Sequence, residues 1–220
     1  MLDWNQIDSV FLDMDGTLLD LHFDNHFWLE YVPQRYAEAR GIPVEQARRS
    51  LLARYQSIEG TLQWYCIDHW SRELGLDIAL LKQEVDHLIG VHPHVVTFLD
   101  SVRGLGKRLV LVTNAHQKSL ALKLDKTRLG GHLDRVICAH DLDLPKEHAG
   151  FWERLQQLEP FDPQQTLFVD DSRPVLESAR RYGIRWLIRV LRPDTQGPLR
   201  EAEGFDAIHD FSEIMPGKRA

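Results

Sequence analysis

Short apolar runs alternate with helix-periodic segments along most of this chain, and one long helical stretch interrupts them near the start. The first apolar run, Val10 to Leu12, ends on two aspartates separated by one residue. Continuous apolar runs of this kind are typical of strands that are buried on both faces of a parallel sheet. From Pro93 onward, strand-like and helix-like segments take turns. This alternation predicts an α/β fold built on a parallel sheet with helices on both faces.

The same patterns place the remaining elements of this sheet and its helices. We expect helices over residues 95–105, 117–129, 147–158 and 174–182. We expect strands over residues 108–113, 135–138, 166–169 and 185–190, and an edge strand at 207–208 before a closing segment at 211–215.

The segment after Thr17 changes to a helical pattern that continues for about seventy residues. Its aromatic side chains recur at helical spacing, as in Phe23 and Phe27, and such rings are more readily explained as the insert's own core than as a ligand surface. Breaks at Gly41, at Thr61 and at Gly75 divide the segment into about four helices, with Thr61 as the expected N-cap of one of them.

The length of 220 residues allows one substantial core that carries a smaller insert. We predict that residues 1–19 and 92–220 form the core and that residues 20–91 form the helical insert. The hydrophobic fraction of 43% and the charged fraction of 27% are those of an ordinary globular protein, so extensive disorder is not expected.

The net charge of −7 argues against a general attraction to nucleic acid polymers or to anionic membranes. Lysine and arginine are scattered along the chain, so an anionic substrate needs cations gathered by the fold. Residues 1–9 contain neither a basic segment nor a long apolar stretch, which predicts no signal peptide and no membrane span. We therefore expect a cytoplasmic protein.

Cysteine and histidine spacing does not indicate a metal site. Cys66 and Cys138 lie far apart and outside any C-x-x-C spacing, which predicts two reduced, buried thiols in place of a zinc site or a redox pair. The densest histidine group, His92-Pro93-His94, has no neighbouring cysteine and favours a turn over metal binding.

Polar residues suited to phosphate chemistry follow several of the predicted strands. In open α/β sheets, ligands bind beyond the carboxyl ends of the strands, so these residues are expected to lie close together. Taken singly, each has an ordinary explanation as a turn residue, a helix cap or a solvated lysine. The residues in question are Asp13, Asp15, Thr113, Asn114, Lys146, Asp170 and Asp171.

The carboxylates in this set predict a bound cation. Asp170 and Asp171 repel one another, and placing them near Asp13 and Asp15 is unfavourable unless a positive charge compensates. Oxygen-only ligands together with a phosphate substrate favour Mg²⁺, which keeps waters and substrate oxygens in its remaining positions. Thr113 and Asn114 could hold phosphate oxygens at the start of a helix, and Lys146 could neutralise charge.

These motifs, in this order, resemble the haloacid dehalogenase-like (HAD) phosphohydrolases. The resemblance covers nearly the whole chain, and it implies a Rossmann-like parallel-sheet core with an inserted all-helical cap domain. It further implies that Asp13 is the nucleophile and Asp15 the general acid and base, while Thr113 and Lys146 contact phosphate. The implied Mg²⁺ ligands are Asp13, the backbone carbonyl of Asp15, and Asp171, with Asp170 acting through water.

A second set of segments is similar to the nucleotidases of this family that hydrolyse GMP and IMP. These segments are 12–21, 23–25, 27–28, 64–66 and 113–116. The resemblance implies a small-molecule phosphate ester as substrate, and specifically a purine 5′-mononucleotide. The candidate substrate-binding residues are Asp24, Asn25, Gln63, Trp64, Asn114 and His116.

Other functions remain compatible with these residues. Within the same superfamily the alternatives are a sugar-phosphate phosphatase, a phosphomutase or a carbon–halogen hydrolase. A phosphate-accepting signalling receiver also combines carboxylates, Thr and Lys around a parallel sheet, but its shorter chain carries no insert of this kind. The sequence does not decide between a monomer and a homodimer.

Overall fold

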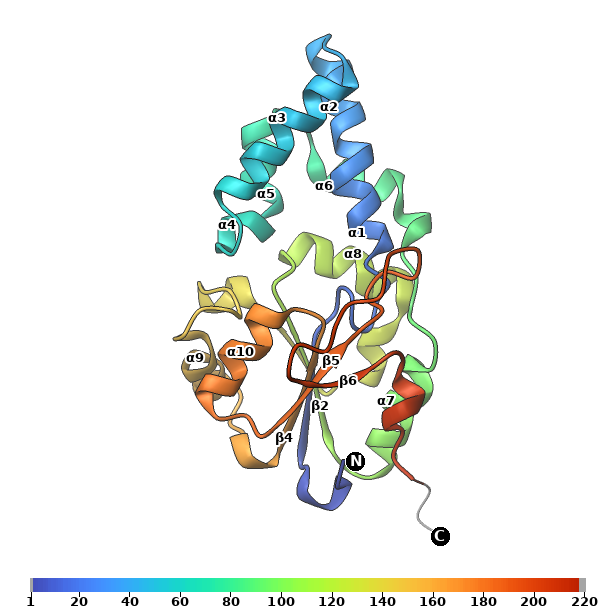
Figure 1. Ribbon diagram of the computed structural model, residues 1–220, viewed down its shortest axis with the longest axis vertical. Helices are drawn as coiled ribbons and strands as arrows, with labels where there is room; N and C mark the ends of the chain where they lie inside the picture. The colour runs from blue at the N-terminus through green and yellow to red at the C-terminus, as the bar shows by residue number, and fades with distance from the viewer. Residues whose placement is uncertain (1, 218–220) are drawn as a thin grey trace.

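A six-stranded parallel sheet forms the centre of the molecule, with strand order β3-β2-β1-β4-β5-β6 (Figure 1). The computed structural model describes residues 2–217. The predicted strands are confirmed to within about one residue, as is usual for buried apolar runs. Their bounds are β1 Ser9–Leu12, β2 Arg108–Thr113, β3 Arg135–Cys138, β4 Thr166–Asp170, β5 Trp186–Val190 and the edge strand β6 Asp206–Ile208.

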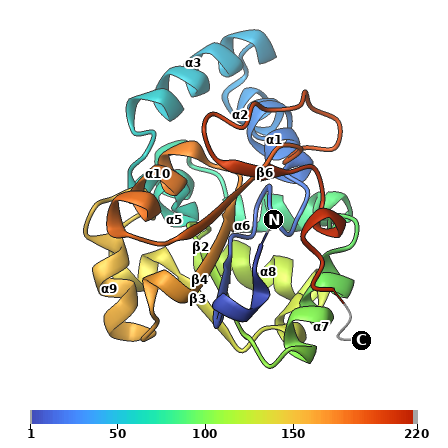
Figure 2. The same cartoon turned by 60° about the horizontal axis from the view of Figure 1, so that its bottom comes forward.

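Helices cover both faces of this sheet, as predicted. On one side lie α7 (Val95–Gly104) and α8 (Gln117–Thr127), and on the other lie α9 (Phe151–Leu158) and α10 (Arg173–Tyr182) (Figure 2). Strand β1 is buried between these layers. Its Val10 and Leu12 belong to the apolar cluster under α7 and α8, whereas Phe11 belongs to the cluster under α9 and α10.

One predicted helix start is wrong. Helix α9 begins at Phe151 and not at residue 147, because the preceding residues form a turn. The backbone N–H of His148 donates to the carbonyl of Pro145, and the N–H of Phe151 donates to the carbonyl of His148. These bonds span three residues, as in turns, and the four-residue bonds of an α-helix begin only after them.

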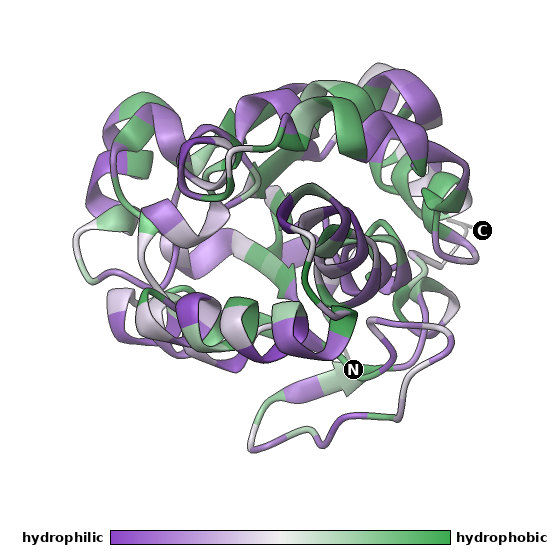
Figure 3. Ribbon diagram, turned by 90° about the horizontal axis from the view of Figure 1, so that it is seen from above, coloured by the Kyte–Doolittle hydropathy of each residue, from purple (hydrophilic) through white to green (hydrophobic). Residues whose placement is uncertain are grey.

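The segment predicted as a helical insert forms a separate group of helices around its own apolar cluster, which includes Phe23, Phe27 and Trp70 (Figure 1). We call residues 20–91 the helical unit. Polar and apolar residues alternate along its helices, as in the rest of the fold (Figure 3). Its elements are α1 His22–His26, a π-helical turn Phe27–Tyr31, α2 Val32–Arg40, α3 Val44–Ser57, α4 Leu62–Tyr65, α5 Ile67–Leu74 and α6 Ile78–Glu84.

The helix breaks fall where the sequence placed them, with two corrections. Gly41 and Gly75 end helices in the left-handed conformation that glycine adopts without strain. Thr61 occupies the N-cap position of α4, but its hydroxyl donates to the Ile58 carbonyl and does not cap the helix. An additional break occurs at Cys66, whose sulfur accepts the backbone N–H of His69 at the start of α5.

Two neighbouring segments connect the helical unit to the rest of the chain. The backbone N–H of Asp20 donates to Gly90, and that of His92 donates to Leu18, so the two connections lie side by side. His92 also hydrogen-bonds the carbonyl of Pro193 through Nε2 at 3.1 Å. In the part of the chain that the structure describes, no helix is both long and apolar enough to cross a membrane.

Candidate active site

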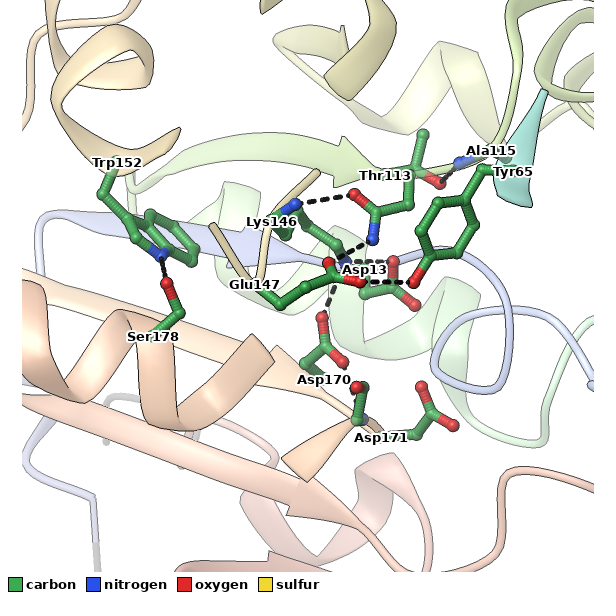
Figure 4. Close-up of polar contacts among 12 residues, drawn as sticks. Asp13, Tyr65, Thr113, Ala115, Lys146, Glu147, Trp152, Asp170, Asp171 and Ser178 are labelled. Carbon is green, nitrogen blue, oxygen red and sulfur yellow. Dashed lines mark hydrogen bonds and ion pairs between the residues drawn. The ribbon is translucent and has the colours of Figure 1, made fainter. Parts of the chain in front are cut away.

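The carboxyl ends of three central strands bring the predicted polar residues to one edge of the sheet. Leu12 at the end of β1 is paired with Leu111 of β2 and with Val169 of β4. Asp13 and Asp170 directly follow these paired residues, and Thr113 follows Leu111 by two residues, so the three lie at the same edge of the sheet (Figure 4).

Three buried carboxylates and one buried lysine form the centre of this site. Asp13, Asp170 and Asp171 each offer an oxygen within 4.8 Å of the others. The Nζ of Lys146 donates to Oδ1 of Asp13 at 2.5 Å and to Oδ2 of Asp170 at 2.7 Å. Lys146 and Arg200, which pairs with Asp171, supply two positive charges against three carboxylates, so the cluster keeps excess negative charge in a region from which water is largely excluded.

Burial is the main cause of the shifted pKa values of these carboxylates, and the neighbouring charges modify the shifts. Burial raises the pKa of Asp13 to about 6, with Lys146 opposing the change and Asp170 adding to it. Burial likewise raises the pKa of Asp170 and of Asp171 to about 6. Burial alone would lower the pKa of Lys146, but the charges of Asp13 and Asp170 raise it above its usual value, so this lysine stays protonated.

Asp171 is held by a contact that the sequence did not indicate. Arg200, from the loop after β5, donates through Nη1 to Oδ2 of Asp171 at 2.7 Å. Gly16 packs against the same carboxylate, because a Cβ at this position would lie 2.8 Å from Oδ2 of Asp171. The φ of Gly16 is +83°, so this turn requires glycine for both its conformation and its close approach.

Asp15 lies outside the three-carboxylate cluster and belongs to a chain of ion pairs. The buried Nζ of Lys123, from α8, donates to Oδ1 of Asp15 at 2.6 Å and to Oδ2 of Asp24 at 2.6 Å. The buried Lys82, from α6, donates to the other oxygen of Asp24 at 2.7 Å. This chain connects the sheet edge to the helical unit.

The two aspartates of this chain have opposite pKa shifts. Burial raises the pKa of Asp15 to about 6. The charge of Lys123 lowers this pKa, and the charges of Asp24 and Asp13 act against Lys123. Burial also acts on Asp24, but the two lysines prevail and lower its pKa to about 2. Asp15 therefore exchanges protons near neutral pH, whereas Asp24 stays ionised.

Asn114 cross-links the loops around the site. Its Oδ1 accepts the backbone N–H of Lys146, and its Nδ2 donates to Glu147 at 2.9 Å. The hydroxyl of Tyr65, from the helical unit, donates to the other oxygen of Glu147 at 2.9 Å (Figure 4). The hydroxyl of Thr113 accepts the N–H of Ala115 at 3.0 Å, which shapes the loop at the end of β2.

A cavity of about 670 Å³ lies between this sheet edge and the helical unit. That volume is within the usual range for small-molecule sites. Its described lining contains Asp13, Asp15, Thr113, Lys146, Asp170 and Asp171 from the core, and Trp28, Tyr55 and Trp64 from the helical unit. Phe23 and Phe27 are instead buried in the core of the helical unit.

The predicted substrate-binding residues are placed unequally. Asp24, Asn25, Trp64, Asn114 and His116 line the cavity, whereas Gln63 is exposed and is not among the described lining residues. Both oxygens of Asp24 accept hydrogen bonds from lysines, and Nδ2 of Asn25 donates to Asp194 at 2.7 Å. The polar atoms of Asp24 are therefore already paired in this structure.

Sequence reasoning missed Lys82, Lys123, Glu147 and Arg200, although all four contact predicted site residues. A lysine is usually solvated, and only its position on an otherwise apolar helix face could have distinguished Lys123. The sequence did contain this signal. Lys123 follows Leu120 by three residues and adjoins Leu124, which places it on the apolar face of the predicted helix. Arg200 lies in a loop with no periodicity from which its direction could be predicted.

Comparison with known proteins gives consistent results. The family model for haloacid dehalogenase-like hydrolases matches residues 7–183. The GMP/IMP nucleotidase YrfG of Escherichia coli is 36% identical over 213 residues, which cover 97% of this chain and 96% of the relative. Phosphoglycolate phosphatase 1 of Pseudomonas aeruginosa is 24% identical, and the match covers 94% of this chain and 78% of the relative. The crystal structure of a HAD phosphatase from Thermococcus onnurineus superposes with a TM-score of 0.79 at 22% identity, covering 94% and 96% of the two chains.

Proposed function

Since the chain belongs to the haloacid dehalogenase-like hydrolases, we propose that it is a Mg²⁺-dependent phosphomonoester hydrolase whose substrate is a purine 5′-mononucleotide, GMP or IMP. The observation that carries the proposal is the buried cluster of Asp13, Asp170 and Asp171 beside Lys146, at the mouth of a cavity large enough for a nucleotide. We further propose that residues 1–19 and 92–220 act as the catalytic core and that the helical unit acts as its cap.

The donor set fits the expected cation. Three buried carboxylates supply only oxygen ligands, and they outnumber the cations of Lys146 and Arg200 that pair with them, which leaves a negative charge that a divalent ion would compensate. Asp13, Asp171 and the backbone carbonyl of Asp15 would hold Mg²⁺, with Asp170 contributing through water. When bound, Mg²⁺ would neutralise phosphate oxygens and hold them in position.

Asp13 is suited to act as the nucleophile. Lys146 orients its carboxylate and favours the charged form. A carboxylate oxygen of Asp13 would attack phosphorus, the bond from phosphorus to the ester oxygen would break, and an aspartyl-phosphate would form. Water would then attack the same phosphorus, which releases inorganic phosphate and regenerates Asp13.

Asp15 is suited to move the protons of both steps. Its pKa of about 6 lies near neutral pH, where an acid–base group is most effective. Protonated Asp15 would donate to the departing ribose oxygen in the first step and would accept a proton from the attacking water in the second. Such a positioned group contributes roughly 10²- to 10⁴-fold to the rate.

The cavity wall that faces the sheet edge supports a nucleotide over a smaller ester. Trp28, Tyr55 and Trp64 present aromatic surface there, on which a purine base can stack. The Escherichia coli relative bears the name of a GMP/IMP nucleotidase and matches along nearly the whole chain, which includes this wall. Phosphoglycolate is the second candidate substrate, because relatives of that name also match.

A substrate panel tests the proposal. We would measure kcat/KM for GMP, IMP, AMP, phosphoglycolate and glucose 6-phosphate, with Mg²⁺ and with EDTA, and subtract an Asp13→Asn preparation as the blank for contaminating phosphatases. We expect hydrolysis that requires Mg²⁺ and favours GMP and IMP by about tenfold or more. Equal rates on all esters would remove the purine assignment, and an absence of Mg²⁺-dependent hydrolysis would overturn the phosphatase itself.

A further inference from the structure

A second group of possible metal ligands lies where the helical unit meets the core. Cys66 stands between α4 and α5, His116 precedes α8, and His140 lies in the short helical turn Ala139–Leu142 after β3. One ligand atom from each residue lies within 4.8 Å of the other two. The three residues are far apart in sequence, so their spacing gave no sign of this group.

We propose that Cys66, His116 and His140 bind a thiophilic divalent cation of the Zn²⁺ class and thereby tie the helical unit to the core. One sulfur and two imidazole nitrogens suit Zn²⁺ and disfavour Mg²⁺, which prefers oxygen. Three protein ligands leave one position of a tetrahedral ion for water or for a further side chain.

His140 shows the features of a ligand without its ion. Its Nε2 is buried and has no hydrogen-bond partner among the described residues, which is unfavourable for a nitrogen that could otherwise bind water. The ring centroids of His140 and His116 are 5.0 Å apart.

The other two donors are held only by weak contacts that a cation could replace. The sulfur of Cys66 accepts the N–H of His69 at 3.4 Å, and Nδ1 of His116 accepts the N–H of Lys118 at 3.3 Å. Nε2 of His116 lies 3.8 Å from Oδ2 of Asp68.

Binding requires at most a small approach of the two parts of the molecule. Zinc bonds of about 2.0–2.3 Å place tetrahedral donor atoms about 3.3–3.6 Å apart. The three donor atoms already lie within 4.8 Å of one another, so they need to close by no more than about 1.5 Å. Cys66 belongs to the helical unit and both histidines belong to the core, so the bound ion draws these parts together beside the existing contact of Lys118 with Asp68.

Zinc titration of the whole protein tests this site. Tag-free, metal-stripped, reduced protein is titrated with Zn²⁺ against a chromophoric chelator, with Mg²⁺ in large excess to occupy the carboxylate cluster. We compare the wild type with Cys66→Ser, His140→Gln and the matched control Cys138→Ser. Serine is a favourable N-cap, so Cys66→Ser keeps α5 intact. The Cys138 thiol donates to the Ala115 carbonyl, which serine can also do.

We expect one Zn²⁺ per chain in the wild type and in Cys138→Ser, and binding weakened by about tenfold or more in the other two variants. Substituted Co²⁺ should show a sulfur-to-metal charge-transfer band that only Cys66→Ser abolishes. Hydrogen exchange in residues 62–74 should slow when Zn²⁺ binds. The proposal is overturned if the wild type binds no Zn²⁺ at micromolar concentrations, if Mg²⁺ displaces it, or if the two cysteine variants behave alike.

Discussion

At the scale of single residues, the electrostatics of the site depend on which lysine each carboxylate contacts. Asp15 and Asp24 share Lys123, but Asp24 has Lys82 as a second partner and Asp15 has the like charge of Asp13 nearby. The pKa of Asp24 is therefore lowered to about 2 while that of Asp15 is raised to about 6. Lys123 thus positions Asp15 and limits how far its pKa rises.

Replacing this lysine should change the pH dependence of turnover. In Lys123→Met, Asp15 loses the cation that lowers its pKa, so its pKa rises further. A general acid must be protonated, and the alkaline limb of the kcat profile should therefore move to higher pH by about one unit. The measurement is kcat against pH, with folding checked by thermal unfolding because a broken buried ion pair costs about 3–5 kcal/mol.

Lys126→Met is the matched control for this experiment. Lys126 lies on the same helix but is exposed, and it pairs with Asp86 away from the site. Its substitution should leave the profile unchanged. A Lys123→Met protein that folds and keeps the wild-type alkaline limb would contradict the role given to Lys123.

At the scale of elements, the turn after β1 determines how closely the first and fourth strands can bring their carboxylates. Gly16 has a φ of +83° and packs against Asp171. Because glycine has no side chain, the turn after β1 can approach the carboxylate that follows β4. The close approach of the turn after β1 to Asp171 therefore depends on one glycine.

Gly16→Ala should lose stability and also weaken Mg²⁺ binding. The left-handed conformation costs a residue with a Cβ about 1–2 kcal/mol, and the new Cβ would displace the Asp171 carboxylate that it would approach to 2.8 Å. Gly106→Ala is the matched control, because Gly106 has a φ of +72° with no atom within 4 Å of the added Cβ. Urea unfolding should show a loss in both variants, while a Mg²⁺ titration should show weaker binding only in Gly16→Ala. Equal Mg²⁺ affinity in the two variants would argue against this role for Gly16.

The sequence predicted strands better than helix ends, for a physical reason. The apolar run of β2 reflects burial on both faces of the sheet, which the local sequence reveals, and its predicted bounds are confirmed. The start of α9 at Phe151 follows a turn at residues 145–148, and the backbone of that turn is held at Lys146 by the side chain of Asn114, more than thirty residues away. The break at Cys66 and the π-helical turn at Phe27–Tyr31 also have no local signal of the kind that glycine or proline supplies.

The same distinction applies to the site. Asp13, Lys146, Asp170 and Thr113 could be placed together because they follow strands whose ends must meet. Lys123, Glu147 and Arg200 reach the site from a helix face and from loops, so their contacts depend on tertiary packing that one sequence does not reveal. The grouping of Cys66 with His116 and His140 is of this second kind and was not anticipated.

At the scale of the whole molecule, the core and the helical unit enclose one cavity, and buried charges couple them. Asp13, Asp170 and Asp171 have pKa values raised to about 6, above the value of 3.8 for an exposed aspartate. The folded chain therefore binds these protons more tightly than the unfolded chain does. As pH rises from about 4 through 6, these groups lose protons and reduce the free energy of unfolding, an effect that a bound divalent ion would offset.

The stabilisation by Mg²⁺ should consequently depend on pH. Below about pH 6 the ion must displace protons from the cluster, whereas above it the carboxylates are already free. The rise in Tm caused by saturating Mg²⁺ should be larger at about pH 7.5 than at about pH 5. Each additional kcal/mol of stabilisation by the ion corresponds to a further rise of about 2–4 °C. Asp171→Asn should reduce the rise at both pH values. A rise that is equal at the two pH values in the wild type would contradict this electrostatic account.

The most direct test of the central claim is whether Asp13 carries the phosphoryl group. Wild type, Asp13→Asn and the exposed control Asp125→Asn are mixed with GMP labelled in its phosphate and with Mg²⁺, then quenched in acid. We expect labelled protein in the wild type and in Asp125→Asn, and hydroxylamine should release the label as inorganic phosphate, as it does from an acyl phosphate. We expect no label in Asp13→Asn, with turnover slower by about a thousandfold or more. Labelled protein or near-normal turnover in Asp13→Asn would contradict the account.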